Sequence, residues 1–411
     1  MPNINFNHSH HFHFPRISID GSKNMKLLFG IRVVRELANK FALFFLPVFL
    51  FQLGQETGFF SNFGLTSFQS GVVLLSLFFA LTRAFVFLTL IPAGNFMRKY
   101  GFSASFMLSF LSYAVELIAL RFAGGNINWL WLAIPADSIA TSLMWGGFNT
   151  LLSKGARRSR MGKDLGFLQV LLNLTWLIAP ALSGFIIYLF GYEILFTVGV
   201  GFVAVGSLIS YFLDFPHEKD SISVKELSFW LGDGRFWKLG LSIFGKAIHD
   251  NSIYIWPLYI FLILGNTEKV GIIYSLSFLV SMIMSLFIGM KLDSKARRKP
   301  FFLSGGVLSF LWVLRSQVLG FWSIAIVDSL DKITGNFHWL FFDRVLMNRG
   351  KGREAFSYFT YREMIISFAS FLFWAIFASI FLFSSMEWDG LFVVGGVGVL
   401  LSLLINKKHE D

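Results

Sequence analysis

Residues 67–92 read SFQSGVVLLSLFFALTRAFVFLTLIP. Only one residue in this stretch, Arg83, carries a charge. A helix needs about 20 mostly apolar residues to cross the roughly 30 Å hydrocarbon core of a bilayer. The stretch is too long and too uniformly apolar to be a strand of a membrane barrel. It therefore predicts a membrane-spanning α-helix.

Similar stretches recur along the 411-residue chain and predict twelve spans in all. They lie near 33–54, 67–92, 101–121, 128–152, 165–189 and 191–212, then near 237–264, 269–291, 300–318, 320–343, 355–383 and 388–405. We predict an all-α membrane protein with twelve transmembrane helices in two six-helix, pseudo-symmetric bundles. The expected parts are a disordered tail (1–29), an N-terminal bundle (30–213), a cytoplasmic linker (214–235), a C-terminal bundle (236–406) and a tail (407–411).

The composition excludes other classes of protein. Hydrophobic residues make up 55% of the chain and charged residues 14%, whereas a soluble domain carries about a quarter charged residues. The absence of cysteine excludes disulfides, zinc–thiolate sites and thiol catalysis. We expect no cofactor and no metal centre. A metal-binding tail is the alternative to a plain disordered tail, because the tail contains His8, His10, His11 and His13.

The net charge of +11 follows membrane topology, so we expect no nucleic-acid partner. Most of the 35 basic residues lie in the tails and in the loops after the even-numbered spans. Only Arg121, Lys269 and Arg315 are expected on the opposite side. Basic loops stay in the cytoplasm and face anionic lipid. We therefore predict a multi-pass protein of the cell membrane with both termini in the cytoplasm.

The two halves of the chain repeat each other weakly. Ala136-Asp137-Ser138-Ile139 in the fourth span matches Val327-Asp328-Ser329-Leu330 in the tenth, and similar pairs keep their order along both halves. Two matching six-helix halves are typical of carriers that work by alternating access. From about residue 30 to 406 the pattern resembles the major facilitator superfamily of secondary transporters. That resemblance implies a monomer whose first, fourth, seventh and tenth helices line a central cavity.

The signature of that family, between the second and third spans, reads roughly Gly-x-Leu-Ala-Asp-Arg-x-Gly-Arg-Arg/Lys. Gly94 and Gly101 match its glycines, but Arg98 replaces the aspartate that is thought to latch the cytoplasmic side. The copy between the eighth and ninth spans keeps the aspartate, as Asp293. The resemblance thus implies a cytoplasmic gate, for which our candidates are Gly94, Arg98, Gly101, Gly289, Asp293, Arg297, Arg83 and Glu363.

Charged residues deep in the spans are the candidates for the transport site. An ion at the bilayer centre costs about 2.5–3.5 kcal/mol, so it needs protein or water around it. Asp137, Lys246 and Asp331 each fall about 15 Å into a span at 1.5 Å per residue. We take as candidates for the substrate and proton pathway the residues Asp137, Lys246, His249, Asp250, Asp328, Asp331, Lys332 and Gln52.

Spacing joins several of these candidates on one helix face. Lys246 and Asp250 are four residues apart, as are Asp328 and Lys332, so each pair can form an ion pair along its helix. The pairs either hold helices in register or form a polar site that binds cargo and takes up a proton. We expect Asp137 or Asp331 to titrate during the cycle. Glu116 is expected near the outer end of its span, where it can snorkel to the interface.

We predict a secondary active transporter that moves a small solute, coupled to protons, rather than an enzyme. A nucleotide-binding loop, a His-Glu-x-x-His motif and a Gly-x-Ser-x-Gly motif are all missing from the sequence. Uptake and efflux both remain open, as does the cargo. The alternatives are a carrier-like receptor without transport, a lipid flippase and a membrane-embedded enzyme.

Overall fold

The computed structural model describes residues 23–58, 60–155, 161–216, 222, 234–291, 298–350, 354–383 and 387–405. All regular structure in these residues is helical, as predicted. The first half holds α1 (Lys23–Ala42), α2 (Leu46–Thr57), α3 (Ser67–Ala123), α4 (Leu130–Ser142), α5 (Trp145–Gly155) and α6 (Met161–Tyr211). The second half holds α8 (Gly234–Leu264), α9 (Thr267–Lys291), α10 (Arg298–Leu314), α11 (Phe321–Arg349), α12 (Ala355–Phe383) and α13 (Glu387–Ser402).

Two glycines divide the longest helices into separate passes. At 1.5 Å per residue the 57 residues of α3 would extend about 85 Å, far beyond the thickness of a bilayer. Gly101 interrupts α3 with φ 85°, and Gly191 interrupts α6 with φ 76°. Glycine tolerates this backbone region because it has no Cβ. α3 and α6 therefore supply two passes each.

The first and fourth expected spans are each broken in the middle. α1 ends at Ala42 and α2 begins at Leu46, with Pro47 in its first turn. Proline lacks a backbone N–H, so it begins a helix more easily than it continues one. α4 likewise ends at Ser142 and α5 begins at Trp145. Counted with these breaks, the helices are consistent with the twelve expected passes.

The expected disordered tail is too long at its C-terminal end. Residues 23–29 belong to α1, and Leu28 and Phe29 are buried. The apolar side chains of this segment, Met25, Leu28 and Phe29, recur at helical spacing and are buried in the main hydrophobic core. This pattern favours a helix over an irregular coil. The expected linker is also shorter, since α8 begins at Gly234.

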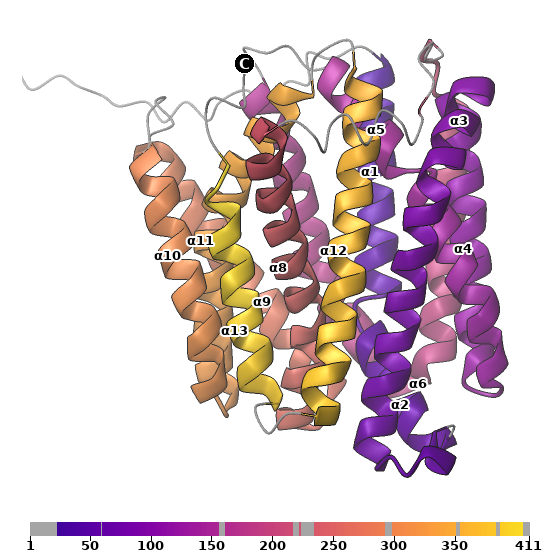
Figure 1. Cartoon of the computed structure of the whole chain (residues 1–411), viewed down its shortest axis with the longest axis vertical. Coiled ribbons are helices and arrows are strands. Elements are labelled where there is room, and N and C mark those ends of the chain that lie inside the picture. Colours follow the sequence, from indigo (N-terminus) through magenta and orange to yellow (C-terminus); the bar gives the residue numbers. More distant parts are fainter. Residues whose placement is uncertain are drawn as a thin grey trace, which may run out of the picture.

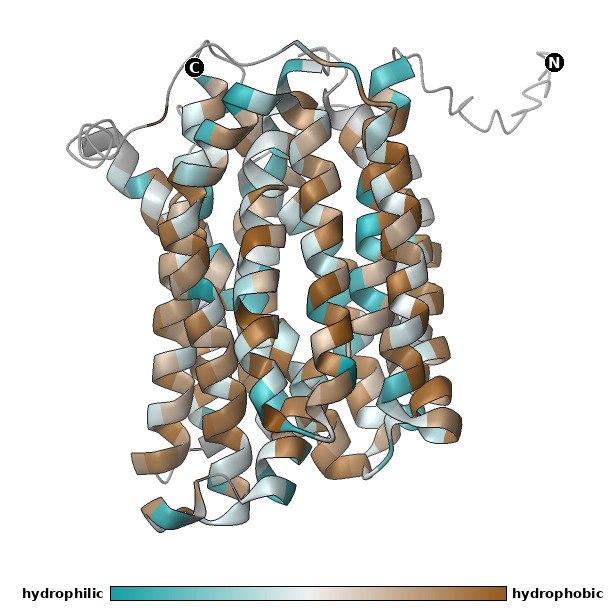
Figure 2. Ribbon diagram, turned by 90° about the vertical axis from the view of Figure 1, so that its right-hand side faces the viewer, coloured by the Kyte–Doolittle hydropathy of each residue, from teal (hydrophilic) through white to brown (hydrophobic). Residues whose placement is uncertain are grey.

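The outer surface of the bundle is apolar, as a lipid-facing surface requires. Leu88, Trp131, Leu303 and Ile326 are among the large side chains that are more than half exposed. Figure 2 shows that hydrophobic residues predominate along the helices. Six helical segments of the described residues are long and apolar enough to cross a membrane, including the two double-pass helices. The prediction of an all-α membrane protein is confirmed.

The two halves of the chain lie side by side (Figure 1). They meet where α3 packs against α12 and where α6 packs against α9. At the first seam, Phe79 stacks on Trp374 with ring centroids 4.5 Å apart. α1 begins and α13 ends at one end of the bundle (Figure 1), which we call the terminal end; the opposite one is the distal end.

Candidate functional site

A cavity of about 490 Å³ lies between the two halves. Its walls come from helices α1 to α6 on one side and from α8, α9, α11 and α12 on the other. Six of the predicted site residues line it, and the other two, Asp328 and Gln52, lie outside its lining. The six are Asp137, Lys246, His249, Asp250, Asp331 and Lys332.

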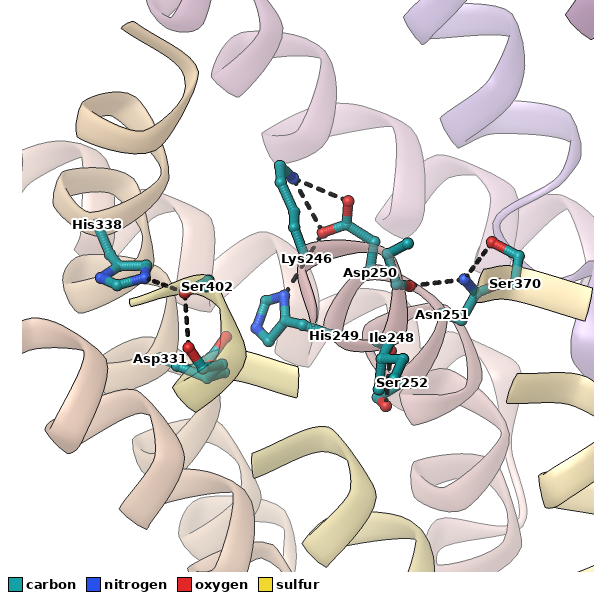
Figure 3. A network of polar contacts seen from close by, with 12 residues as sticks. Lys246, Ile248, His249, Asp250, Asn251, Ser252, Asp331, His338, Ser370 and Ser402 are labelled. Atoms are coloured by element: carbon teal, nitrogen blue, oxygen red, sulfur yellow. Dashed lines mark hydrogen bonds and ion pairs between the residues drawn. The ribbon is translucent and has the colours of Figure 1, made fainter. Parts of the chain in front are cut away.

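On α8, Lys246, His249 and Asp250 share one face of the helix, as predicted, and this face lines the cavity. The Lys246 ammonium lies 2.8 Å from Asp250 Oδ2, and His249 Nδ1 lies 3.5 Å from Asp250 Oδ1 (Figure 3). The two side chains of the Lys246–Asp250 pair are 23% and 53% exposed. Asn251, on the neighbouring face, donates a hydrogen bond of 2.8 Å from its Nδ2 to Oγ of Ser370 in α12. The exposed pair can exchange its partners with water or a ligand in the cavity.

On α11 the second predicted pair also forms, but it is buried. Lys332 Nζ lies 2.9 Å from Asp328 Oδ1, and these side chains are 6% and 0% exposed. The indole of Trp256 donates 3.2 Å to the same oxygen of Asp328. Asp331 lines the cavity and lies 3.3 Å from the guanidinium of Arg315. Asp328 and Asp331 of α11 are therefore both paired with basic side chains of the protein, Lys332 and Arg315.

Arg315 was expected on the side opposite the cytoplasm, and its burial was not foreseen. Its side chain is fully buried, in a short 3₁₀ turn (Arg315–Gln317) after α10. Its guanidinium lies 3.7 Å from the Trp312 ring and 4.7 Å from the Trp256 ring. The two cation–π contacts and the carboxylate of Asp331 thus offset the free-energy cost of removing the guanidinium from water.

A charged face of α1 was missed. Arg32, Glu36 and Lys40 follow at every fourth residue, and this spacing was the available signal. Arg32 pairs with Glu36, which also accepts a 2.7 Å hydrogen bond from Trp176 Nε1. The Lys40 ammonium lies 4.0 Å from the centroid of the same indole ring. Arg32, Lys40 and Trp176 all line the cavity.

Glu116 was also misplaced by its sequence position. It is fully buried and lines the cavity instead of snorkelling to the interface. Neither of its carboxylate oxygens has a hydrogen-bond partner among the described residues. It lies within electrostatic range of Asp137, Arg35 and Arg83. Its side chain therefore points into the bundle, toward these charges.

Gln52 lies outside the cavity lining, and in the part of the chain that the structure describes the gate candidates Arg83 and Glu363 form no ion pair with each other. Gln52 accepts a 3.2 Å hydrogen bond from Tyr192 within the first half. Glu363 accepts from Asn149 at 3.3 Å and from its neighbour Arg362 at 2.9 Å. Arg83 lies instead at the cavity wall. The contact of Glu363 with Asn149 joins α12 to α5 near the terminal end.

The first copy of the family signature has a structural role at two glycines. Gly94 packs so closely on Ile222 that an added Cβ would lie 2.6 Å from Ile222 Cδ1. Gly101 is the residue that interrupts α3 and separates its two passes, so that the chain reverses direction there. Arg98 is exposed. Of the second copy, Gly289 lies in the last turns of α9. Asp293 and Arg297 lie outside the described residues, as do His8, His10, His11 and His13 of the tail.

At the distal end the halves touch through their backbones. A Cβ on Gly271 of α9 would lie 2.4 Å from the carbonyl oxygen of Pro180 of α6. A Cβ on Gly184 of α6 would lie 2.6 Å from the carbonyl oxygen of Thr267 of α9. Near the terminal end, Ser153 of α5 donates 2.9 Å to the carbonyl of Met347 of α11. The cavity thus lies between two sets of contacts that cross the seam.

Comparisons with solved structures identify the fold. The human organic anion transporter MFSD10 superposes with a TM-score of 0.71 at 13% identity, covering 93% of this chain and 99% of that one. The fucose:proton symporter FucP of E. coli superposes with a TM-score of 0.62 at 13% identity, covering 94% and 98%. A second structure of FucP, in the outward conformation, gives a TM-score of 0.63 at 12% identity, with the same coverage.

No curated protein matches the sequence as a relative. The family model described as "Major Facilitator Superfamily" matches residues 28–330, well over half of the chain. The resemblance noted from the repeated halves is confirmed by this match and by the structural neighbours. The chain therefore belongs to the Major Facilitator Superfamily, a family of multi-pass membrane transporters rather than enzymes.

Proposed function

We propose that this protein is a secondary active transporter that moves a small solute across the cell membrane by alternating access. The observation that carries the proposal is the charged cavity at the seam, walled by both halves and lying between two sets of contacts across that seam. If the halves rock about the site, one set opens while the other closes. The N-terminal and C-terminal bundles are then the moving units, joined by a linker that lies between Tyr211 and Gly234.

Energy coupling by protons is the second part of the proposal. Carboxylates line the cavity, and Asp137 or Asp331 is the one that we expect to exchange a proton during the cycle. Asp137 accepts a 3.1 Å hydrogen bond from Thr141. The neighbour FucP is titled a fucose:proton symporter, which supports proton coupling as a mode available to this fold. Uptake, efflux and the cargo are left open.

Neutralising these acids is expected to uncouple transport. In proteoliposomes with an imposed pH gradient and a panel of labelled solutes, Asp137→Asn or Asp331→Asn should reduce gradient-driven uptake by tenfold or more. Solute exchange at equal pH should remain, because exchange needs no net proton movement. Asp389→Asn, on an exposed residue of α13, is the matched control. Full gradient-driven uptake in both cavity variants would exclude coupling through these acids.

The orientation can be tested with single cysteines, because the chain has none. Asn126 is exposed in the loop before α4 at the distal end, and Tyr100 is exposed beside the reversal at Gly101 at the terminal end. In intact cells a membrane-impermeant maleimide should label Asn126→Cys at once. Tyr100→Cys should react only after the cells are permeabilised. The reverse pattern would contradict cytoplasmic termini.

The alternatives are a receptor without transport, a lipid flippase and a membrane-embedded enzyme. The same vesicle panel separates them from the carrier. A carrier gives solute flux, a flippase moves labelled lipid between leaflets, and an enzyme releases a product. Binding without any of these three would favour the receptor.

A further inference from the structure

We infer that the cavity binds an organic anion with an aromatic body, its carboxylate or similar group lying between Lys40 and Lys332. This inference rests on the proposed function, because it names the class of solute for the same cavity. It starts from two ammonium groups, one on α1 and one on α11, that line the cavity from opposite halves. They lie close enough for their charges to interact.

Within the described part of the chain, Lys40 forms no ion pair of its own. Among the described residues, no carboxylate lies within the 4.0 Å of an ion pair from its ammonium. The acids within electrostatic range of it are Glu36 and Asp250. Both oxygens of Glu36 are used, one by Arg32 and one by Trp176. Both oxygens of Asp250 face Lys246. An ammonium in this setting favours a ligand that brings negative charge.

Lys332 has N–H donors that an anionic ligand could use. An ammonium has three N–H donors, and the structure shows one carboxylate oxygen of Asp328 as its partner. Its ammonium also lies 4.6 Å from the ring centroid of Tyr274 and 4.9 Å from that of Phe278. An anion bound between the two ammonium groups would be attracted to both of them, and these two attractions would offset the repulsion between the ammonium groups. It would also link α1 of one half to α11 of the other.

The walls beside the two ammonium groups are aromatic and cross the seam. Trp176 of α6 packs edge-on against Phe278 of α9, with ring centroids 4.9 Å apart. Phe44, between α1 and α2, packs edge-on against Tyr274 of α9 at 4.6 Å. All four rings line the cavity. Such walls favour a planar apolar body, because aromatic pairs gain more than their buried area alone gives. A small hydrated ion gains nothing from them.

Binding to the purified full-length protein tests the inference. Three aromatic carboxylates of increasing size, benzoate, 1-naphthoate and 9-anthroate, are titrated by calorimetry beside their neutral amides. We expect at least one carboxylate to bind tenfold or more tightly than its amide. Lys40→Gln should weaken that binding by about tenfold or more, and Lys40→Arg should keep it within about threefold. Lys238→Gln, on an exposed residue of α8, should leave it unchanged.

The melting temperature of each variant shows whether it is folded before its binding is compared. Equal binding of acid and amide, no binding of any carboxylate, or full affinity in folded Lys40→Gln would overturn the inference. A flux assay with the same compounds in proteoliposomes keeps the two proposals apart. Flux of the amides but not of the acids would overturn the anion site and leave the transporter standing. Binding of the acids without their flux would support the anion site and overturn transport of these acids.

Discussion

Gly271→Val is expected to stop transport by preventing the distal ends of α6 and α9 from closing on each other. Even one added carbon would lie 2.4 Å from the backbone oxygen of Pro180, which cannot move aside as a side chain can. Forcing extra carbon into a close contact costs about 1–3 kcal/mol. At about 2 kcal/mol the equilibrium between closed and open distal ends shifts about thirtyfold toward open. Solute flux in vesicles should fall by a similar factor.

The same change should be visible as accessibility of the cavity. A cysteine at Ile366, which lines the cavity, can report it, because the chain has no other cysteine. With Gly271→Val, an impermeant maleimide added on the distal side should label Ile366→Cys faster than in the parent. Gly306→Val on α10 is the matched control, since a Cβ there meets no atom within 4 Å. Unchanged flux and unchanged labelling would mean that this contact does not take part in closure.

Lys332→Met is expected to destabilise the protein by about 3–5 kcal/mol, because it leaves the fully buried Asp328 without its cation. Asp328→Asn combined with Lys332→Met removes both charges and should recover most of that stability. Transport should stay lost in the double variant if Lys332 also contacts the solute. Thermal unfolding in detergent measures the first effect, and vesicle flux measures the second.

The Lys246–Asp250 pair provides the control for this experiment. It has the same four-residue spacing, but its aspartate is 53% exposed to the cavity. Exposed ion pairs contribute about 0–1 kcal/mol, so Lys246→Met should hardly change the melting temperature. Equal losses of stability in Lys246→Met and Lys332→Met would show that burial does not distinguish the two pairs.

Features that depend on near neighbours in the chain were predictable from the sequence. The membrane helices follow from long apolar stretches such as 67–92, because the solvent for such a stretch is lipid wherever it lies in the bundle. The two Lys–Asp pairs follow from four-residue spacing along a single helix, and both form. The family resemblance follows from motifs repeated in order along the two halves. It needed no knowledge of how the halves meet.

Features that join distant parts of the chain were decided only by the tertiary structure. Arg315 and Asp331 lie on different helical segments, and their pairing depends on how α11 is rotated toward the turn after α10. Glu36 and Trp176 are 140 positions apart and meet because α1 packs on α6. Depth along a span placed Glu116 near an interface, yet the direction of its side chain buries it. The sequence by itself determined which apolar segments cross the membrane. Packing determined which charged side chains face the cavity and which partners they have, because the direction of each side chain depends on helix rotation.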